Sequence, residues 1–164
     1  MLAAIGVVLC LGAQGWALAS PSLLPAPSDL REEAKLIRQD NRPLIVLFSL
    51  PDCGYCKEVR ENYLQPLVRD VPEAERALIR EVDISSNAPL NGFNGEALTQ
   101  AQFASRYKVK MAPTVIMLDE TGVPLADPLV GAGMAGFYGA YLDNALAKSK
   151  QALMLHHGTM SGKR

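Results

Sequence analysis

The spacing of apolar and polar residues predicts an alternation of strands and helices along most of the chain. Residues 44–48 are continuously apolar and rich in branched and aromatic side chains, as expected of a buried strand. A helical segment separates this strand from the next apolar run, so the two strands should lie parallel in one sheet. The predicted strands are 44–48, 77–84, 114–118 and 123–130, and the predicted helices are 30–40, 53–65, 96–107 and 134–153.

Residues with special backbone preferences refine these elements. Ser28 is the expected N-cap of the first helix. Pro124 and Pro128 indicate that the last strand lies at a sheet edge, because proline cannot donate a ladder hydrogen bond. The polar segment 85–95 is predicted to be a loop, which is either a solvated connection or, with Phe93 exposed, part of a groove wall.

Length and charge narrow the class of protein. The chain has 164 residues, of which 49% are hydrophobic, and its formal net charge is −1. This length suits one domain with a substantial core. The sequence contains no basic patch with interleaved aromatic residues, so we expect no nucleic-acid partner.

The first 28 residues carry no charge and differ from the rest of the chain. They begin with an apolar run, and a small-x-small pattern ends at Ala19, which predicts a signal peptide at 1–19 and export of the protein. A basic residue near the start, which is usual in signal peptides, is missing. An uncleaved anchor is the alternative, although the apolar run is short for a membrane span. Leu9 before Cys10 is too bulky for a lipoprotein cleavage site, so no lipid anchor is predicted.

Two cysteines, Cys53 and Cys56, remain after the signal peptide, and they lie where a predicted strand turns into a helix. The first turn of a helix has unpaired backbone N–H groups and the positive end of the dipole. A thiolate is stabilised there, so Cys53 should ionise more readily than a free thiol. Cys56 follows within one turn and can attack a mixed disulfide formed by Cys53. We therefore expect Cys53 to be a nucleophile and Cys56 to be its resolving thiol.

Two other uses of such a pair stay open, namely a zinc site and a structural disulfide. Zinc needs four ligands. The further candidates are Cys10, which would leave with the signal peptide, and His156 and His157 near the C-terminus, so no metal site is predicted. A structural disulfide across so small a loop would constrain the unfolded chain little. Redox use is therefore favoured.

The order of these features resembles the thioredoxin superfamily over about residues 42–148. The resemblance rests on Cys53-Gly54-Tyr55-Cys56, on Met111-Ala112-Pro113-Thr114 before a strand, and on the Gly122 hairpin after it. It implies an α/β, thioredoxin-like fold with a central mixed β-sheet flanked by helices. The expected organisation is a signal peptide at 1–19, a leader and N-terminal helix at 20–41, a thioredoxin-like domain at 42–150 and a C-terminal tail at 151–164.

The resemblance also implies substrate-binding residues. In that family the proline of the second motif is cis and packs beside the cysteines, so Pro113 is expected to do so here. Ala112 would then offer backbone groups to an extended substrate peptide, and Tyr55 would line the same surface. The alternative is a trans proline that merely opens a strand.

The sequence departs from cytoplasmic thioredoxin at two places. The family's buried aspartate is replaced by Leu47, six residues before Cys53, so Glu58 or water would have to take the proton of the resolving thiol. The Gly54-Tyr55 dipeptide is similar to that of exported bacterial disulfide isomerases and reductases. The dimerisation domain of those isomerases has no counterpart here, which leads us to expect a monomer.

Together these features predict a periplasmic thiol–disulfide oxidoreductase that acts through Cys53 and Cys56 on disulfides of exported proteins, with reduction favoured over oxidation. A membrane electron donor upstream is expected, because the compartment is oxidising. No cofactor is expected. The alternative is a non-catalytic thioredoxin-like binding module whose disulfide is structural.

Overall fold

A four-stranded mixed sheet forms the centre of the molecule, in the strand order β2-β1-β5-β6. The computed structural model describes residues 24–72, 77–132 and 136–161. The predicted signal peptide at 1–19 and the predicted helix start at residue 134 lie outside these ranges. Strands β1 (Leu44–Ser49) and β2 (Leu78–Asp83) are parallel, as expected, and β5 (Thr114–Leu118) and β6 (Leu129–Val130) continue the sheet in antiparallel pairs.

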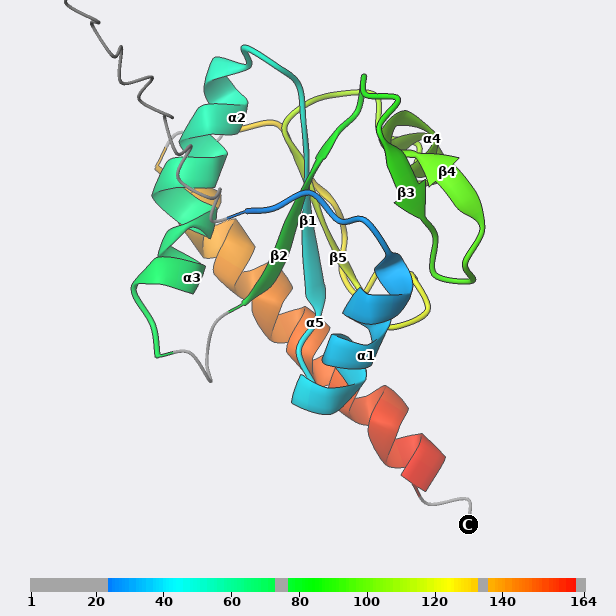
Figure 1. The fold of residues 1–164 in the computed structure, drawn as a ribbon. Coiled ribbons are helices and arrows are strands. Elements are labelled where there is room, and N and C mark those ends of the chain that lie inside the picture. Colours follow the sequence, from blue (N-terminus) through cyan, green and yellow to red (C-terminus); the bar gives the residue numbers. More distant parts are fainter. Residues whose placement is uncertain (1–23, 73–76, 133–135, 162–164) are drawn as a thin grey trace, which may run out of the picture.

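Helices cover both faces of this sheet (Figure 1). On one face lie α1 (Leu30–Asp40), α4 (Gln100–Arg106) and a small sheet of β3 (Pro89–Asn91) and β4 (Ala97–Thr99). On the other face lie α2 (Gly54–Glu58), the π-helical segment η1 (Val59–Leu64), α3 (Pro66–Arg69) and the long α5 (Tyr138–Ser161). Within the described part of the chain, no helix is both long and apolar enough to span a membrane.

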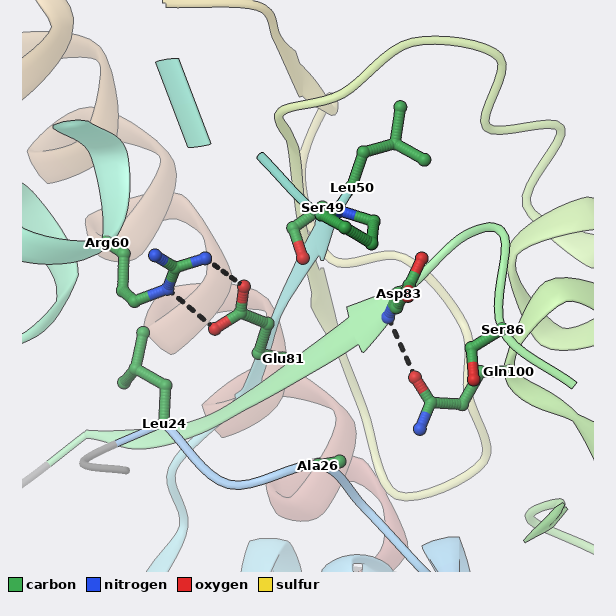
Figure 2. Close-up of a pocket in the computed structure, with 10 residues that line it drawn as sticks. Leu24, Ala26, Ser49, Leu50, Arg60, Glu81, Asp83, Ser86 and Gln100 are labelled. Atoms are coloured by element: carbon green, nitrogen blue, oxygen red, sulfur yellow. Dashed lines mark hydrogen bonds and ion pairs between the residues drawn. The ribbon is translucent and has the colours of Figure 1, made fainter. Parts of the chain in front are cut away.

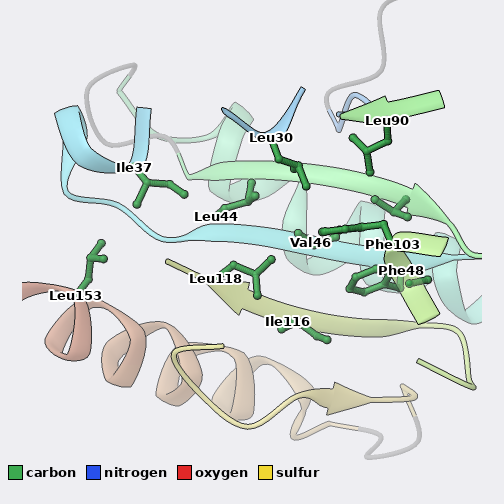
Figure 3. Close-up of a cluster of buried hydrophobic side chains, with 12 residues drawn as sticks. Leu30, Ile37, Leu44, Val46, Phe48, Leu90, Phe103, Ile116, Leu118 and Leu153 are labelled. Atoms are coloured by element: carbon green, nitrogen blue, oxygen red, sulfur yellow. The ribbon is translucent and has the colours of Figure 1, made fainter. Parts of the chain in front are cut away.

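Strand β1 supplies both halves of the core, because all six of its residues are buried and successive side chains point to opposite faces. Val46 and Phe48 join the cluster that includes Phe103 of α4 (Figure 3), where the Phe48 and Phe103 rings stack with centroids 5.9 Å apart. Ile45 and Leu47 join the second cluster, under η1 and α5. The apolar run predicted a buried strand, and the structure confirms it.

Helix α1 has the predicted bounds, but its N-cap lies one residue later than predicted. Asp29, rather than Ser28, is the N-cap, and its carboxylate accepts a hydrogen bond of 2.9 Å from the backbone N–H of Arg31. Asn91 of β3 donates to the same carboxylate over 3.3 Å, which fastens the start of the helix to the small sheet. Leu30 and Ile37 are fully buried in the core, so α1 is part of the domain.

The segment 85–95 differs from the predicted loop, because it contains β3, which pairs with β4. The following helix begins at Gln100 rather than at residue 96. Thr99 caps this helix through a capping box with Gln102, and the three residues before Gln100 are extended. The edge strand is shorter than the predicted 123–130, since β6 has only two residues.

The C-terminal part of the chain is more ordered than the predicted tail at 151–164, because α5 continues to Ser161. Leu153 is fully buried in the first core cluster. Further along, His157 lies 3.4 Å from the Glu120 carboxylate, in the turn after β5. These long-range contacts explain why the helix extends past the predicted end near residue 153.

Candidate active site

Cys53 and Cys56 form a disulfide in the structure, with Cα atoms 5.2 Å apart. Cys53 is the N-cap of α2, directly after the loop that leaves β1, and it is partly exposed. Cys56 lies inside the helix and has no exposed surface. The pair is therefore asymmetric, with one partly exposed cysteine and one buried cysteine.

Backbone hydrogen bonds at the start of α2 hold this geometry. The N–H of Cys56 donates to the Sγ of Cys53 over 3.1 Å, and the N–H of Lys57 donates to the Cys53 carbonyl over 3.0 Å. When the disulfide is reduced, the Cys56 N–H is placed to donate to the Cys53 thiolate and to stabilise its negative charge. The predicted placement of the motif at a helix start is confirmed.

The charged side chains next to the motif contribute less. Lys57 is exposed and its Nζ lies 3.9 Å from a carboxylate oxygen of Glu61, so its charge is solvated and partly compensated. Asp52, with a left-handed φ of 56°, is exposed as well. Glu58, which was one expected proton acceptor, is also exposed. The main electrostatic support for a Cys53 thiolate is therefore the helix backbone.

The second predicted motif, residues 111–114, lies at the same end of the sheet as the cysteine motif. Phe48 near the end of β1 pairs with Thr114 at the start of β5, so the loop before Thr114 lies beside the loop that leads to Cys53. The Ala112–Pro113 peptide bond is cis, as the resemblance implied, and the trans alternative is wrong. Pro113 is buried and Ala112 is partly exposed.

Hydrogen bonds fix this loop from both sides. The Pro113 carbonyl accepts from the N–H of Gly131 over 2.7 Å, and the Thr114 hydroxyl donates to the Met111 carbonyl over 2.7 Å. Met111 in this loop and Val130, which pairs with Thr114, are 57% and 59% exposed, and Tyr55 of the cysteine motif is 66% exposed. The segments that carry the predicted substrate contacts thus meet at one end of the sheet.

The histidines considered as zinc ligands lie elsewhere. His156 and His157 approach Asp119 and Glu120, which follow the far end of β5. In the described ranges, no three His, Cys, Asp or Glu side chains come together in a way that could hold a metal ion. A zinc site that combines the cysteines with these histidines is therefore incompatible with the fold.

An ion pair near the motif was not predicted from the sequence. Leu47 is fully buried, and its register partner on β2 is Glu81, whose carboxylate receives two hydrogen bonds from Arg60 of η1, one of them 2.7 Å long. The signal that could have found this pair is the charge of Glu81 within a predicted core strand. Its partner could not be identified without the register.

The sequence matches the model of a known protein family. A family model described as a thioredoxin-like domain matches residues 30–146. The chain belongs to the thioredoxin-like domain family. The matched region includes α1, in agreement with the packing of that helix into the core. No curated protein matches this thioredoxin-like chain in sequence.

Solved structures agree on the fold of this thioredoxin-like protein. Mitochondrial thioredoxin 3 of Saccharomyces cerevisiae, in its oxidised form, is 19% identical with a TM-score of 0.50, over 77% of this chain and 98% of that one. The thioredoxin of Fasciola hepatica is also 19% identical with a TM-score of 0.50, over 77% and 99%. Thioredoxin f of spinach chloroplasts is 15% identical with a TM-score of 0.51, over 77% and 88%.

Family and site together define the activity class. A thioredoxin-like fold whose Cys53–Cys56 pair stands at disulfide distance at the start of a helix supports thiol–disulfide exchange. The protein is a thiol–disulfide oxidoreductase.

Proposed function

We propose that this thioredoxin-like protein is an exported disulfide reductase, which acts in the periplasm on disulfides of exported proteins. The observation that carries the proposal is the asymmetry of the cysteines, since Cys53 is partly exposed and Cys56 has no exposed surface. An exposed thiolate can reach a substrate sulfur, and a buried thiol next to it can only attack Cys53. The exposure of each sulfur therefore assigns its role.

The reaction has two exchange steps. The reduced Cys53 thiolate attacks one substrate sulfur, so that a mixed disulfide forms and the other substrate sulfur leaves with the electron pair and takes up a proton. Cys56 then loses its proton and attacks the Sγ of Cys53. The Cys53–Cys56 bond forms, the bond to the substrate breaks, and the second substrate sulfur leaves as a thiolate. The substrate is reduced and the protein is left with its disulfide.

The surface around Cys53 suits an extended polypeptide. Ala112 precedes the buried Pro113 in the loop beside the motif, and it is partly exposed. Its backbone can pair with a substrate strand in the manner of strand addition. The exposed ring of Tyr55 provides an apolar contact beside the reacting sulfur. Tyr55, Ala112 and Pro113 are accordingly the proposed substrate-binding residues.

The compartment and the direction of electron flow rest on sequence features. The uncharged N-terminal segment with its cleavage pattern at Ala19 supports export. The Gly54-Tyr55 dipeptide supports reduction. A reductase in an oxidising compartment needs electrons from a membrane donor, which would reduce the Cys53–Cys56 disulfide after each cycle. The protein is proposed to act as a monomer without a cofactor.

A covalent trap tests the function. Cys56→Ser should accumulate mixed disulfides between Cys53 and exported proteins in cells, because the second step is blocked. Cys53→Ser is the matched control and should trap nothing. The wild-type protein should also reduce insulin, as measured by turbidity with dithiothreitol as the electron source. If Cys56→Ser traps no more than Cys53→Ser and the wild type leaves insulin intact, the binding-module alternative replaces the proposal.

The compartment has its own measurement. The full-length chain expressed in a Gram-negative bacterium should appear in the osmotic-shock fluid with Ser20 as its first residue. A cytoplasmic protein that keeps residues 1–19 would contradict export and leave the chemistry intact.

A further inference from the structure

The buried Cys56 thiol must ionise before it can resolve a mixed disulfide, and burial opposes this. Cys56 has no exposed surface, and desolvation disfavours the charged form of a thiol. The neighbouring strand residue Leu47 is fully buried and apolar, and it supplies no charge. Some other group must stabilise the thiolate form of Cys56.

Arg60 is the cation best placed to do so. It follows Cys56 by four residues in the same helical segment, a spacing that puts two side chains on the same side of a helix. Its side chain is 25% exposed and extends towards β2, where its Nε donates to the Glu81 carboxylate over 2.7 Å (Figure 2). A second bond, from Nη2 to the other carboxylate oxygen, makes the contact bidentate.

Glu81 fixes this arginine under the motif. Its side chain is 17% exposed and lies on the sheet face that also carries Leu47, because the two residues are register partners in a parallel pair. The hydrogen bonds to Glu81 raise the pKa of Arg60 above its ordinary value, so the guanidinium keeps its charge.

A hollow connects the ion pair to solvent beside the loop that leads to the motif. It has a volume of about 350 Å³ and opens at the carboxyl ends of β1 and β2. Its lining includes Leu50 and Pro51, which lead to Cys53, together with Arg60, Glu81 and Asp83. Figure 2 shows Glu81 between Arg60 and Asp83. The hollow therefore exposes the Arg60–Glu81 pair to solvent next to the loop that leads to Cys53.

The other groups around Cys56 are less suited to this role. On its own helical segment, Lys57 and Glu61 are exposed and face each other. On β2, Asp83 is partly buried, and it accepts hydrogen bonds from the N–H and hydroxyl of Ser85. The packed rings of Tyr63 and Tyr138 are phenols, and burial raises the pKa of Tyr138 beyond the physiological range, so this phenol is neutral. Asp52 before the motif is exposed.

We propose that Arg60, held by Glu81, is a positioning residue that favours the thiolate form of Cys56 during the resolving step. This inference rests on the proposed function in one respect, the resolving role of Cys56. The Cys56 proton leaves to solvent water, and the thiolate attacks the Sγ of Cys53. The Cys53–Cys56 bond forms as the bond to the substrate sulfur breaks, and that sulfur departs with the electron pair.

The two members of the pair should affect Cys56 in opposite directions. Arg60→Met removes the cation and leaves Glu81 unpaired, which should lower the ionisation constant of Cys56 about threefold or more. Glu81→Gln leaves the cation uncompensated and should raise that constant by a similar factor. The double variant Arg60→Met/Glu81→Gln should fall between them, and Arg60→Lys should restore most of the wild-type behaviour. A structural role alone would not give shifts of opposite sign.

The measurement is the pH dependence of the Cys56 13Cβ chemical shift in the reduced, cysteine-labelled full chain. It is paired with the pH profile of glutathione release from a preformed Cys53–glutathione mixed disulfide. Lys57→Met is the matched control, since it removes an exposed cation from the same helix and should move neither profile. Thermal unfolding of each variant checks that it folds. If Arg60→Met does not fold, Glu81→Gln and Arg60→Lys are enough to test the inference.

The inference is overturned if Arg60 and Glu81 variants shift the Cys56 midpoint in the same direction or leave it unchanged. This outcome is separate from failure of the proposed function. If Cys56→Ser traps substrates but the Arg60 and Glu81 variants leave the Cys56 titration midpoint unchanged, the proposed function is supported and the role of Arg60 is refuted. If no substrate is trapped, the function falls, and the NMR midpoint still reports on the ion pair.

Discussion

The backbone N–H of Cys56 donates a hydrogen bond of 3.1 Å to the Sγ of Cys53, the more exposed residue of the pair. This donor belongs to the main chain, so it survives substitution of the Cys56 side chain. In reduced Cys56→Ser, the pKa of Cys53 should therefore lie at about 7 or below, compared with about 8.5 for a free thiol. Thiolate absorbance at 240 nm against pH measures it, and the same variant unfolded in guanidinium is the control. A folded-state midpoint at or above the unfolded one would contradict the assignment of Cys53 as the nucleophile.

Tyr55 should contribute to substrate binding and little to stability, because its side chain is 66% exposed. Tyr55→Ala should raise KM for insulin or a disulfide peptide, lowering kcat/KM about fivefold, as expected for the loss of one aromatic contact worth ~1 kcal/mol. The free energy of unfolding should change by less than about 0.5 kcal/mol. Val123→Ala removes a similarly exposed apolar side chain, 52% exposed, at the opposite end of β5, and should leave kinetics unchanged. Equal effects of the two variants would remove Tyr55 from the substrate surface.

Asp29 should make the protein sensitive to acid. The hydrogen bonds from the Arg31 side chain and backbone lower the pKa of the Asp29 carboxyl well below its usual value. A carboxyl whose folded-state pKa is depressed stabilises the fold at pH values above its unfolded-state pKa of about 4, and loses that contribution as the pH falls towards the folded value. Asp29→Asn keeps a capping oxygen and removes the charge. Urea unfolding at low salt should show the wild type more stable than Asp29→Asn at pH 7, with the two curves converging below about pH 4. A constant gap across that range would show that the charge of Asp29 is irrelevant.

Asp119 should be important for stability and unimportant for activity. Its side chain is 3% exposed, and Oδ1 accepts hydrogen bonds from the N–H groups of Thr121 and Val123, each 2.8 Å long. Asp119→Ala leaves both donors without this acceptor and should cost about 2 kcal/mol of unfolding free energy in urea denaturation. Thr121→Val removes only the hydroxyl bond to Asp119 and should cost less than half as much. Both variants should reduce insulin at the wild-type rate per folded molecule, because β5 separates Asp119 from Pro113 by about 20 Å. A loss below about 0.5 kcal/mol for Asp119→Ala would contradict this assignment.

The parts of the fold that were predictable depend on neighbours in the sequence. The continuous apolar run of β1 indicated a strand buried on both faces, and Pro128 indicated an edge for β6. The Cys53 position at a helix start followed from the change of pattern between β1 and α2. Such features arise from side-chain spacing and capping within a few residues, which the sequence displays directly.

Other features depend on residues far apart in the chain. Helix α4 begins later than the predicted helix, because residues 97–99 pair with β3 as strand β4 and do not extend the helix. Helix α5 passes its predicted end because Leu153 packs into the core and His157 meets Glu120. No local pattern marks these partners, so the predicted boundaries there differ from the observed ones.

The sequence by itself determined the redox motif, its place between a strand and a helix, and the thioredoxin-like order of elements. The tertiary structure alone decided which cysteine is buried, which loop lies beside the motif, and that Arg60 meets Glu81 beneath it. The physical reason is that a backbone cap acts within one helical turn, whereas burial and ion pairing follow from strand register. The register of β1 against β2 sets Glu81 opposite Leu47, and it is stabilised by the packing of the whole core.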